Sequence, residues 1–219
     1  DYREIELAKQ NSVHSTVMYT EIDGTKINII DTPGFSDYVG DIVSALSVVE
    51  TAVFVNNATV GVDATTENAW RQTEKTKTPV LFVINQLDHE KANFDKVVGQ
   101  LKENFGEKVT IAQYPVNAGE GFDSAIDLIL MKMLKCEKGG GKSEMLDIPD
   151  SEKDKAEEMQ AAMIEDLAAS DESLMEIFFE NGTLQESEMQ QGLKVGLVSR
   201  GMFPIMCVNA KQNMGVARL

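Results

Sequence analysis

The stretch KINIIDTPGFSDYVGD, residues 26–41, decides the fold of this chain. An apolar run, INII, leads directly into Asp31-Thr32-Pro33-Gly34. In open α/β sheets, ligands bind at the carboxyl ends of the strands, where such a turn lies. An acidic residue there can hold a Mg²⁺ ion through water, and the Gly34 N–H can approach a terminal phosphate without side-chain crowding. The alternative is an ordinary strand-to-helix turn, in which Pro and Gly only end the strand.

The composition indicates a globular α/β protein without a metal framework. At 219 residues the chain is long enough for one large domain, or for one domain that carries a sizeable insertion. No apolar run is long enough to cross a membrane and the N-terminus shows no signal peptide, so we expect a cytoplasmic protein without membrane contact. Cys136 and Cys207 are too few for a disulfide framework or a zinc site, and we expect both to be reduced.

The charge is strongly negative and unevenly distributed. A net charge of −16 argues against broad electrostatic binding of nucleic acid, DNA included, because phosphate binding needs Lys and Arg. The segment from Cys136 to Gln190 carries a net charge of about −12, whereas the first 110 residues carry about −7. This asymmetry predicts two regions with different roles.

Strands and helices alternate through the first 108 residues. We expect a hairpin within residues 13–31 that turns at Asp23-Gly24, helices over 36–49, 65–77 and 91–104, and strands over 51–56 and 79–85. The apolar end of the second hairpin strand predicts that this strand is buried. The alternation predicts a mostly parallel sheet with covered faces.

The pattern changes after residue 108. We expect strands over 109–114, 125–134 and 202–208, helices over 151–169, 172–180 and 185–198, and the beginning of a helix over 215–219. The second of these strands could equally be a buried helix. The predicted organisation is a first segment of the α/β domain over 1–108, an acidic α+β insert over 109–200, and a return segment over 201–219.

Two further segments follow the ends of predicted strands. In Asn85-Gln86-Leu87-Asp88, the Asp88 carboxylate can accept hydrogen bonds from the N1–H and the exocyclic amine of guanine. Adenine lacks this donor pair, and sites that read such donors discriminate by roughly 10⁴ or more. We expect Asn85 to brace the loop, although Asn and Asp are also common in plain turns. In Cys207-Val208-Asn209-Ala210, the Ala210 N–H can meet the guanine carbonyl.

In this order and spacing, the three segments resemble the guanine-nucleotide domain of translational GTPases, specifically the elongation factor G group. The resemblance runs over essentially the whole chain: INIIDTPG, AWRQTEKTKTPVLFVINQLD, a long insert and FPIMCVNAKQNMGVARL. It implies a P-loop NTPase-type doubly wound sheet whose first strand and phosphate loop are absent from this sequence. It also implies GTP or GDP with Mg²⁺ as ligands, a role in ribosomal translocation, and a monomer that contacts ribosomal stalk proteins and ribosomal RNA.

The resemblance also implies roles for individual residues. They are Asp31 and Ser12 for Mg²⁺, Thr32, Pro33 and Gly34 for the turn at the γ-phosphate, Asn85, Gln86 and Asp88 for guanine, and Asn209-Ala210 for the base edge. Residues 36–41 would begin the mobile switch helix.

Several positions depart from the family pattern. Gln10-Asn11-Ser12 replaces Gly-Ile-Thr, although Ser12 keeps a hydroxyl able to reach Mg²⁺ and phosphate. Gln86 replaces a lysine whose aliphatic stem lies against the base, so weaker nucleotide affinity is expected. Asn209 replaces a serine, and the backbone contact of Ala210 should survive.

The most consequential departure is Phe35, which stands where the family has a histidine that positions the attacking water. A phenyl ring offers no conventional hydrogen-bonding group. Such water handling is typically worth on the order of 10² to 10⁴ in rate, or roughly 3 to 5 kcal/mol of barrier. We therefore expect GTP to be bound but hydrolysed slowly. The alternatives are that another side chain or the ribosome supplies the group, or that the protein is a GTP-responsive ribosome-binding module or a ribosome-protection-type factor.

Two features of the insert need separate interpretation. Gly141-Lys142-Ser143 matches the end of the phosphate-loop motif G-x-x-x-x-G-K-[ST], but the motif also needs a glycine where Cys136 stands. We therefore expect a flexible linker here. Because the true phosphate loop is absent from this sequence, the isolated chain is expected to bind GTP poorly. The helix over 151–169 is acidic on one side; it is either a solvated cover for a small sheet or part of a surface for stalk proteins.

Overall fold

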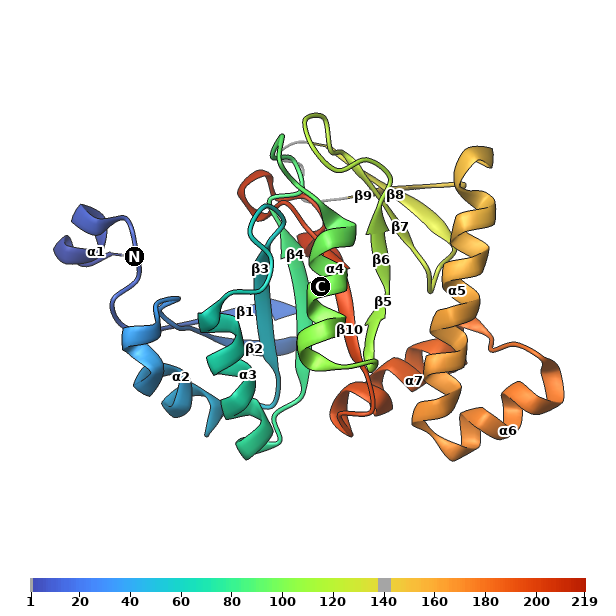
Figure 1. Ribbon diagram of the computed structural model, residues 1–219, viewed down its shortest axis with the longest axis horizontal. Coiled ribbons are helices and arrows are strands. Elements are labelled where there is room, and N and C mark those ends of the chain that lie inside the picture. The colour runs from blue at the N-terminus through green and yellow to red at the C-terminus, as the bar shows by residue number, and fades with distance from the viewer. Residues whose placement is uncertain (1, 138–142) are drawn as a thin grey trace. The chain divides into compact units, whose positions relative to one another are not determined.

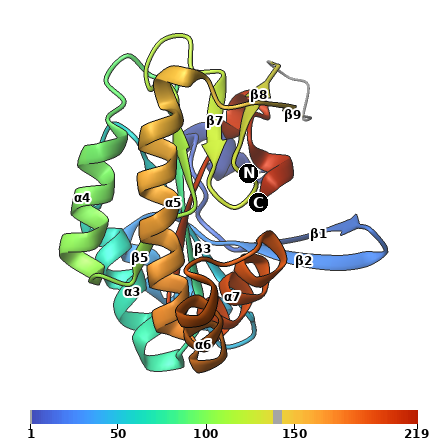
Figure 2. The same ribbon diagram turned by 90° about the vertical axis from the view of Figure 1, so that its right-hand side faces the viewer.

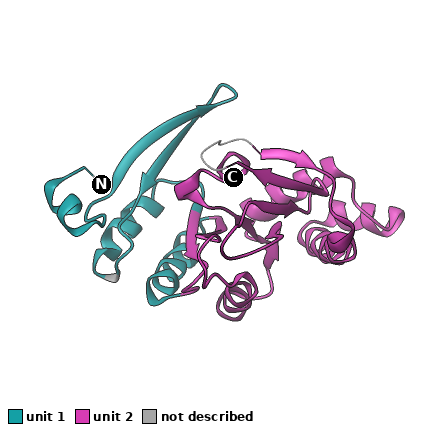
Figure 3. Ribbon diagram, turned by 90° about the horizontal axis from the view of Figure 1, so that it is seen from above, with its two compact units in different colours: residues 1–52, 63–78 teal, residues 53–62, 79–219 magenta. Residues whose placement is uncertain are grey.

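The computed structural model describes residues 2–137 and 143–219, and the chain divides into two compact units (Figure 3). Unit 1 comprises Asp1–Ala52 and Asp63–Thr78, and unit 2 comprises Val53–Val62 and Pro79–Leu219. Each unit is described by itself. Gly141 and Lys142 lie outside the described residues, and the domain boundaries given above remain a prediction.

Unit 1 contains the predicted hairpin. β1 (Thr16–Ile22) and β2 (Thr25–Asp31) pair antiparallel over their full lengths. The turn is Asp23-Gly24, and both residues have positive φ, as a two-residue type I′ turn demands. The expected burial of β2 is wrong, because Ile27 and Ile29 are each 41% exposed. The described residues of unit 1 give this hairpin no third strand, so its apolar side chains stay open to solvent.

The helices of unit 1 begin close to their expected positions. The predicted helix over 36–49 is a 3-10 turn, η1 (Ser36–Tyr38), continued by α2 (Val39–Leu46). α3 (Ala64–Thr76) is confirmed, and its N-cap Asp63 accepts the Thr66 N–H at 2.8 Å. α2 and α3 pack against each other.

A short helix that the sequence pattern did not predict, α1 (Glu4–Lys9), precedes the hairpin. Its Glu6 is buried, and one carboxylate oxygen accepts the backbone N–H groups of Val13 at 3.0 Å and His14 at 3.2 Å. These hydrogen bonds, the Val13 bond first, lower the pKa of Glu6 to about 2. The charged carboxylate therefore ties α1 to the chain that enters β1.

Unit 2 contains a four-stranded sheet in the order β3-β4-β10-β5 (Figure 1). The strands are β3 (Ala52–Asn57), β4 (Val80–Asn85), β5 (Val109–Ile111) and β10 (Phe203–Cys207). β10 pairs parallel with both β4 and β5, which confirms the predicted α/β fold with a parallel sheet. The family-type sheet is thus formed by segments from both ends of unit 2.

An aromatic stack joins this sheet to α4 (Phe94–Phe105), which lies in front of it in Figure 1. Phe82 of β4 stacks on Phe105 with ring centroids 5.4 Å apart, and Phe54 of β3 meets Phe82 edge-on at 5.6 Å. Phe82 is fully buried, so this contact fixes α4 over the strand that ends at Asn85.

The insert forms a second sheet, entirely antiparallel, in the order β6-β7-β8-β9. Its strands are β6 (Gln113–Pro115), β7 (Ser124–Asp127), β8 (Lys132–Cys136) and β9 (Ser143–Leu146). The predicted strand over 109–114 is therefore split, and its first half, β5, belongs to the parallel sheet. The strand β9 was not predicted.

Neither interpretation of residues 125–134 was right, because the segment is the hairpin β7–β8. The Asp127 carboxylate accepts the N–H groups of Ile129 and Leu130, each at 3.0 Å, and Met131 has a φ of 48°. The turn is thus made by one acidic side chain within an apolar sequence that lacks Gly and Pro.

Three acidic helices complete the insert (Figure 2). They are α5 (Asp150–Ser170), α6 (Glu172–Asn181) and α7 (Glu186–Val198), close to their predicted bounds. α5 packs against both α6 and α7. Within residues 2–137 and 143–219, no helix combines the length and apolarity needed to span a membrane.

The segment after β10 returns to the insert through a partly buried ion pair. Arg218 lies in the 3-10 turn η3 (Val216–Arg218), where a helix was expected to begin, and its Nε donates to Asp127 Oδ2 at 2.8 Å. The same oxygen accepts Gln113 Nε2 at 3.0 Å, and Asp127 is 0% exposed. All the acceptor capacity of this carboxylate is used inside the protein.

Replacing Asp127 with alanine should therefore lower the free energy of unfolding by about 3 kcal/mol, because it opens the β7–β8 turn and leaves the Arg218 charge unpaired. Urea denaturation followed by circular dichroism measures this. The control is Asp147→Ala, which removes a solvent-exposed ion pair with Lys132 and should change the free energy of unfolding far less. Equal losses in the two variants would contradict the structural role given to Asp127.

The contacts of Glu6 make the order of α1 dependent on pH. The folded-state pKa lies below the ordinary value of 4.5, so the stabilisation is complete above about pH 4.5 and is lost as the pH falls toward 2. Hydrogen-exchange protection of the Val13 and His14 amides should decline over that window. Glu6→Gln should remove the protection of these amides at neutral pH, whereas Glu4→Gln, a change at an exposed residue, should not. Unchanged protection in Glu6→Gln would contradict the role given to the Glu6 carboxylate.

Candidate functional site

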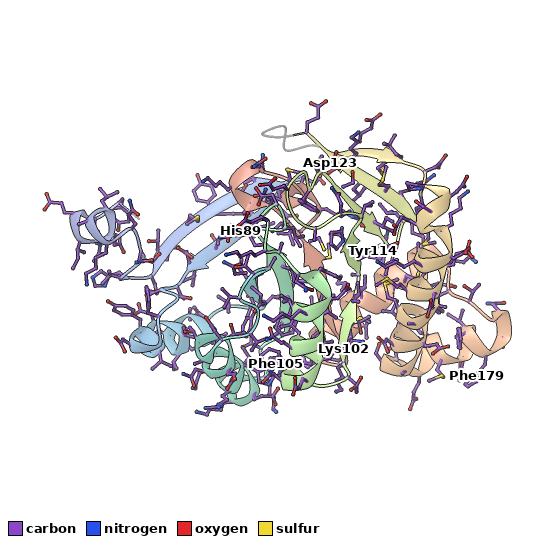
Figure 4. All side chains as sticks on the ribbon, turned by 45° about the horizontal axis from the view of Figure 1, so that its top comes forward. His89, Lys102, Phe105, Tyr114, Asp123 and Phe179 are labelled. Carbon is purple, nitrogen blue, oxygen red and sulfur yellow. The ribbon has the colours of Figure 1, made fainter. Side chains whose placement is uncertain are left out.

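The two segments predicted to read a base leave the same edge of the parallel sheet. β4 ends at Asn85 and β10 at Cys207, and Cys207 lies opposite Ile84 in the register. The pairing continues one step beyond β10, since Val208 N–H donates to Ile84 O at 3.0 Å. The loop that follows β4, marked by His89 in Figure 4, therefore runs beside the loop that follows β10.

Asn85 joins three strand ends. Its side-chain Oδ1 accepts the backbone N–H of Ala210 at 3.0 Å, and its backbone carbonyl accepts Ala58 N–H at 2.9 Å. Ala58 follows β3, so β3, β4 and β10 are fixed to one another at the edge where they end. Asn85 thus braces the loops, as its place in the sequence led us to expect.

Gln86 is held in a strained and specific position. Its φ of 62° lies in the left-handed region, which is uncommon for a residue with a side chain. Its Oε1 accepts Asn57 Nδ2 at 2.9 Å. The next residue, Leu87, is fully buried and its carbonyl accepts Gly119 N–H at 2.8 Å. The amide at the family's lysine position is therefore oriented by Asn57.

Asp88 receives a hydrogen bond that sequence reasoning missed. Gln212 Nε2, in the 3-10 turn η2 (Ala210–Gln212), donates to Asp88 Oδ2 at 3.0 Å. The two residues are 124 positions apart and belong to no common motif, so no local pattern pairs them. The only signal in the sequence was that each lies just beyond a predicted strand.

The loop after β10 is closed on itself. Asn209 and Met214 exchange two backbone hydrogen bonds of 3.0 Å, and Asn209 is 1% exposed. Gly215 follows with a φ of 77°, and a Cβ placed there would lie 2.5 Å from Cys207 O. Glycine is therefore required at this position, and the closed loop fixes Ala210 and Gln212 beside β4.

The predicted phosphate-side residues lie in unit 1. β2 ends at Asp31; Thr32 is half-buried, Pro33 is buried and Gly34 is exposed. A Cβ built on Gly34 would meet nothing within 4 Å in its own unit, and its φ is not positive. Packing in unit 1 therefore does not require a glycine at position 34. Because Gly34 has no side chain, the space beside its backbone is open to an approaching group.

Ser12 and Phe35 come together in unit 1 although they are far apart in the sequence. They line one cavity of about 310 Å³, whose lining residues are Lys9, Asn11, Ser12, Val13, Phe35, Asp37 and Tyr38. Phe35 is 52% exposed. The segment that carries Ser12 is held by Glu6 and by Asp41, whose Oδ1 accepts both the N–H and the hydroxyl of Ser15.

Asp31 and Ser12 could supply only some of the ligands of a Mg²⁺ ion, with water and phosphate oxygens supplying the others. In the described part of the chain, no group of three or more His, Cys, Asp or Glu side chains could hold a metal by itself. Mg²⁺ in nucleotide sites keeps several waters and binds through one or two protein oxygens together with substrate phosphates. Asp31 and Ser12 fit that description.

Comparison with known proteins identifies the family and the fold of this chain. Residues 1–219 match the family described as the elongation factor Tu GTP binding domain. An elongation factor G-like protein of Thermotoga maritima is 33% identical over 216 residues, which cover 99% of this chain and 31% of that protein. A crystal structure of a Thermus thermophilus protein matches the whole chain with a TM-score of 0.90 at 22% identity, covering 32% of that protein's chain, and supports the fold.

The chain therefore spans under a third of the length of its Thermotoga relative. The match of the entire chain to one family confirms the resemblance drawn from INIIDTPG, NQLD and CVNA. The protein belongs to the elongation factor Tu-type GTP-binding domain family of translational GTPases.

Proposed function

We propose that this chain is the guanine-nucleotide domain of an elongation factor G-like translational GTPase that acts in ribosomal translocation. The observation that carries the proposal is the junction of the base-side loops. Ala210 N–H reaches Asn85 Oδ1, and Gln212 reaches Asp88, each at 3.0 Å. Two loops from distant parts of the sequence are thereby held as one surface that can read a base.

The proposed base reading rests on the chemistry of three groups. Asp88 accepts from the N1–H and the exocyclic amine of guanine, which selects guanine over adenine. Asn85 Nδ2 is a further donor toward the base, since its Oδ1 is engaged by Ala210. The Ala210 N–H already donates to Asn85 Oδ1, so a guanine carbonyl would compete with that oxygen for the same hydrogen. That competition, and the replacement of lysine by Gln86, support weaker nucleotide affinity.

The proposed phosphate side uses Asp31, Thr32, Pro33 and Gly34, with Ser12 from the preceding segment. Asp31 and Ser12 are the residues that would hold Mg²⁺, directly or through water. The ion, when bound, neutralises charge on the phosphate oxygens. The open space at Gly34 supports an approach of its backbone N–H to the terminal phosphate.

Slow hydrolysis is proposed because of the groups that surround the phosphate side. Phe35 shares a cavity with Ser12, and the phenyl ring cannot orient a water molecule by hydrogen bonding. The same cavity is lined by Lys9, Asp37 and Tyr38, which could supply a polar group instead. The ribosome could also provide one in trans, as external residues do for other GTPases.

A second candidate function is a GTP-responsive module that binds the ribosome with little or no hydrolysis. Phe35 in the Ser12 cavity, and Gln86 held by Asn57, favour it. A ribosome-protection-type factor is a further variant of the same idea. The measurement that separates these functions is GTP hydrolysis by the full-length protein with and without ribosomes, together with translocation.

The proposed partners are ribosomal RNA and the ribosomal stalk proteins, contacted by a monomer in the cytoplasm. The acidic insert supports a protein rather than a nucleic acid as its own partner. Phe179, labelled on α6 in Figure 4, is 78% exposed among these acidic helices. An exposed aromatic ring on a negatively charged surface suits a basic, partly apolar protein surface.

Phe35→His should raise ribosome-stimulated GTP hydrolysis by about 10² to 10⁴ in single-turnover assays of the full-length protein, because it restores an imidazole beside Ser12. The matched control is Val48→His, which adds an imidazole at a residue of the same unit that is 67% exposed and does not line the cavity. Equal rates in wild type and Phe35→His would show that the water is oriented by another group.

Asp88→Asn should weaken GDP binding by at least about 10²-fold, because the carboxylate that accepts two donors becomes an amide with one acceptor. The same change should improve binding of xanthosine diphosphate, whose 2-carbonyl can accept the new amide N–H. Isothermal titration of each nucleotide into the full-length protein measures the two changes in affinity. Asp95→Asn, an exposed change in the first turn of α4, serves as the control, and unchanged GDP affinity in Asp88→Asn would remove Asp88 from the base site.

A further inference from the structure

The contact between Gln212 and Asp88 joins the loop after β10 to the loop after β4. Gln212 Nε2 donates to Asp88 Oδ2 at 3.0 Å, and both side chains are partly buried. A donor on one carboxylate oxygen fixes the rotation of the carboxylate about its bond to Cβ. Asp88 is therefore held in one orientation by a residue from the other loop.

The backbone of the second loop determines where Gln212 lies. Gln212 N–H donates to Asn209 O at 3.2 Å, and the loop is closed by the paired hydrogen bonds between Asn209 and Met214. Gly215 allows the close approach to Cys207 that ends the loop. Gln212 is thus presented toward Asp88 by a rigid turn, and not by a freely moving side chain on an open loop.

The oxygen of the Gln212 side-chain amide accepts no hydrogen bond from the described residues. This atom, Gln212 Oε1, is buried. A buried polar atom without a partner is unfavourable, and an apolar side chain at this position would avoid that cost. An amide that keeps a buried, unpaired oxygen while donating to Asp88 is explained by a need for the donor.

We propose that Gln212 is a positioning residue that aligns the Asp88 carboxylate with the two donors of guanine and thereby sets the preference for bases that carry the exocyclic amine. The inference rests on the proposed guanine-binding function. Asp88 Oδ2 has a second lone pair, so it accepts the amine while Gln212 holds it. A carboxylate that rotates freely still satisfies one donor but loses the alignment needed for two.

The test compares GDP with inosine diphosphate, which keeps the N1–H but lacks the exocyclic amine. In the full-length protein, Gln212→Leu should lower the ratio of GDP affinity to inosine diphosphate affinity by roughly tenfold. Most of this change should come from weaker binding of GDP. Gln212→Asn, whose shorter side chain cannot reach Asp88, should do the same and covers the case in which the leucine variant does not fold. Gln212→Lys keeps an N–H donor and should retain the wild-type ratio.

Gln190→Leu is the matched control, because it removes an amide-to-carboxylate contact of the same kind, to Glu186, on the surface of α7. It should leave both affinities unchanged. Equal losses for the two nucleotides in Gln212→Leu and Gln212→Asn, or no loss, would overturn the role of Gln212 while leaving guanine binding intact. A wild-type protein that does not prefer GDP over inosine diphosphate would overturn the base-reading proposal itself, and the inference with it.

Discussion

The parallel pairing of β10 with β4 is the constraint that brings together the two loops proposed to read a base. Ala210 and Asn85 are 125 residues apart, and they meet because Cys207 is in register with Ile84. A shift of one residue would turn every side chain of the strand to the opposite face of the sheet. The contacts of Asn85 and of Asp88 with the loop after β10 all follow from this register.

The insert shares a buried network with the end of β10. Gln113 of β6 accepts Cys207 N–H through Oε1 and donates to Asp127 through Nε2, and Arg218 completes the set. Buried polar networks of this kind are stable only when each member is satisfied, so they rigidify what they join. The small antiparallel sheet therefore supports β10, the strand that leads into the second of these loops.

Binding and hydrolysis make different demands on such a fold. The loops proposed to bind guanine leave the ends of paired strands and are joined by hydrogen bonds between them, such as the bond from Ala210 N–H to Asn85 Oδ1. The proposed loss of water handling rests on a single side chain, Phe35, at the edge of a cavity. Because Phe35 is half exposed, its identity is nearly independent of the packing of unit 1. A change of rate without a change of fold is therefore physically simple at this position.

The sequence by itself determined the family, the alternation of strands and helices, and the segments INIIDTPG, NQLD and CVNA, because periodicity and turn chemistry are local. Only the tertiary structure decided that residues 125–134 form a hairpin, since its turn depends on the Asp127 carboxylate. It alone joined Gln212 to Asp88, because a hydrogen bond across 124 residues depends on strand register. It also left β2 exposed, because burial depends on neighbouring elements and not on the apolar character of a strand.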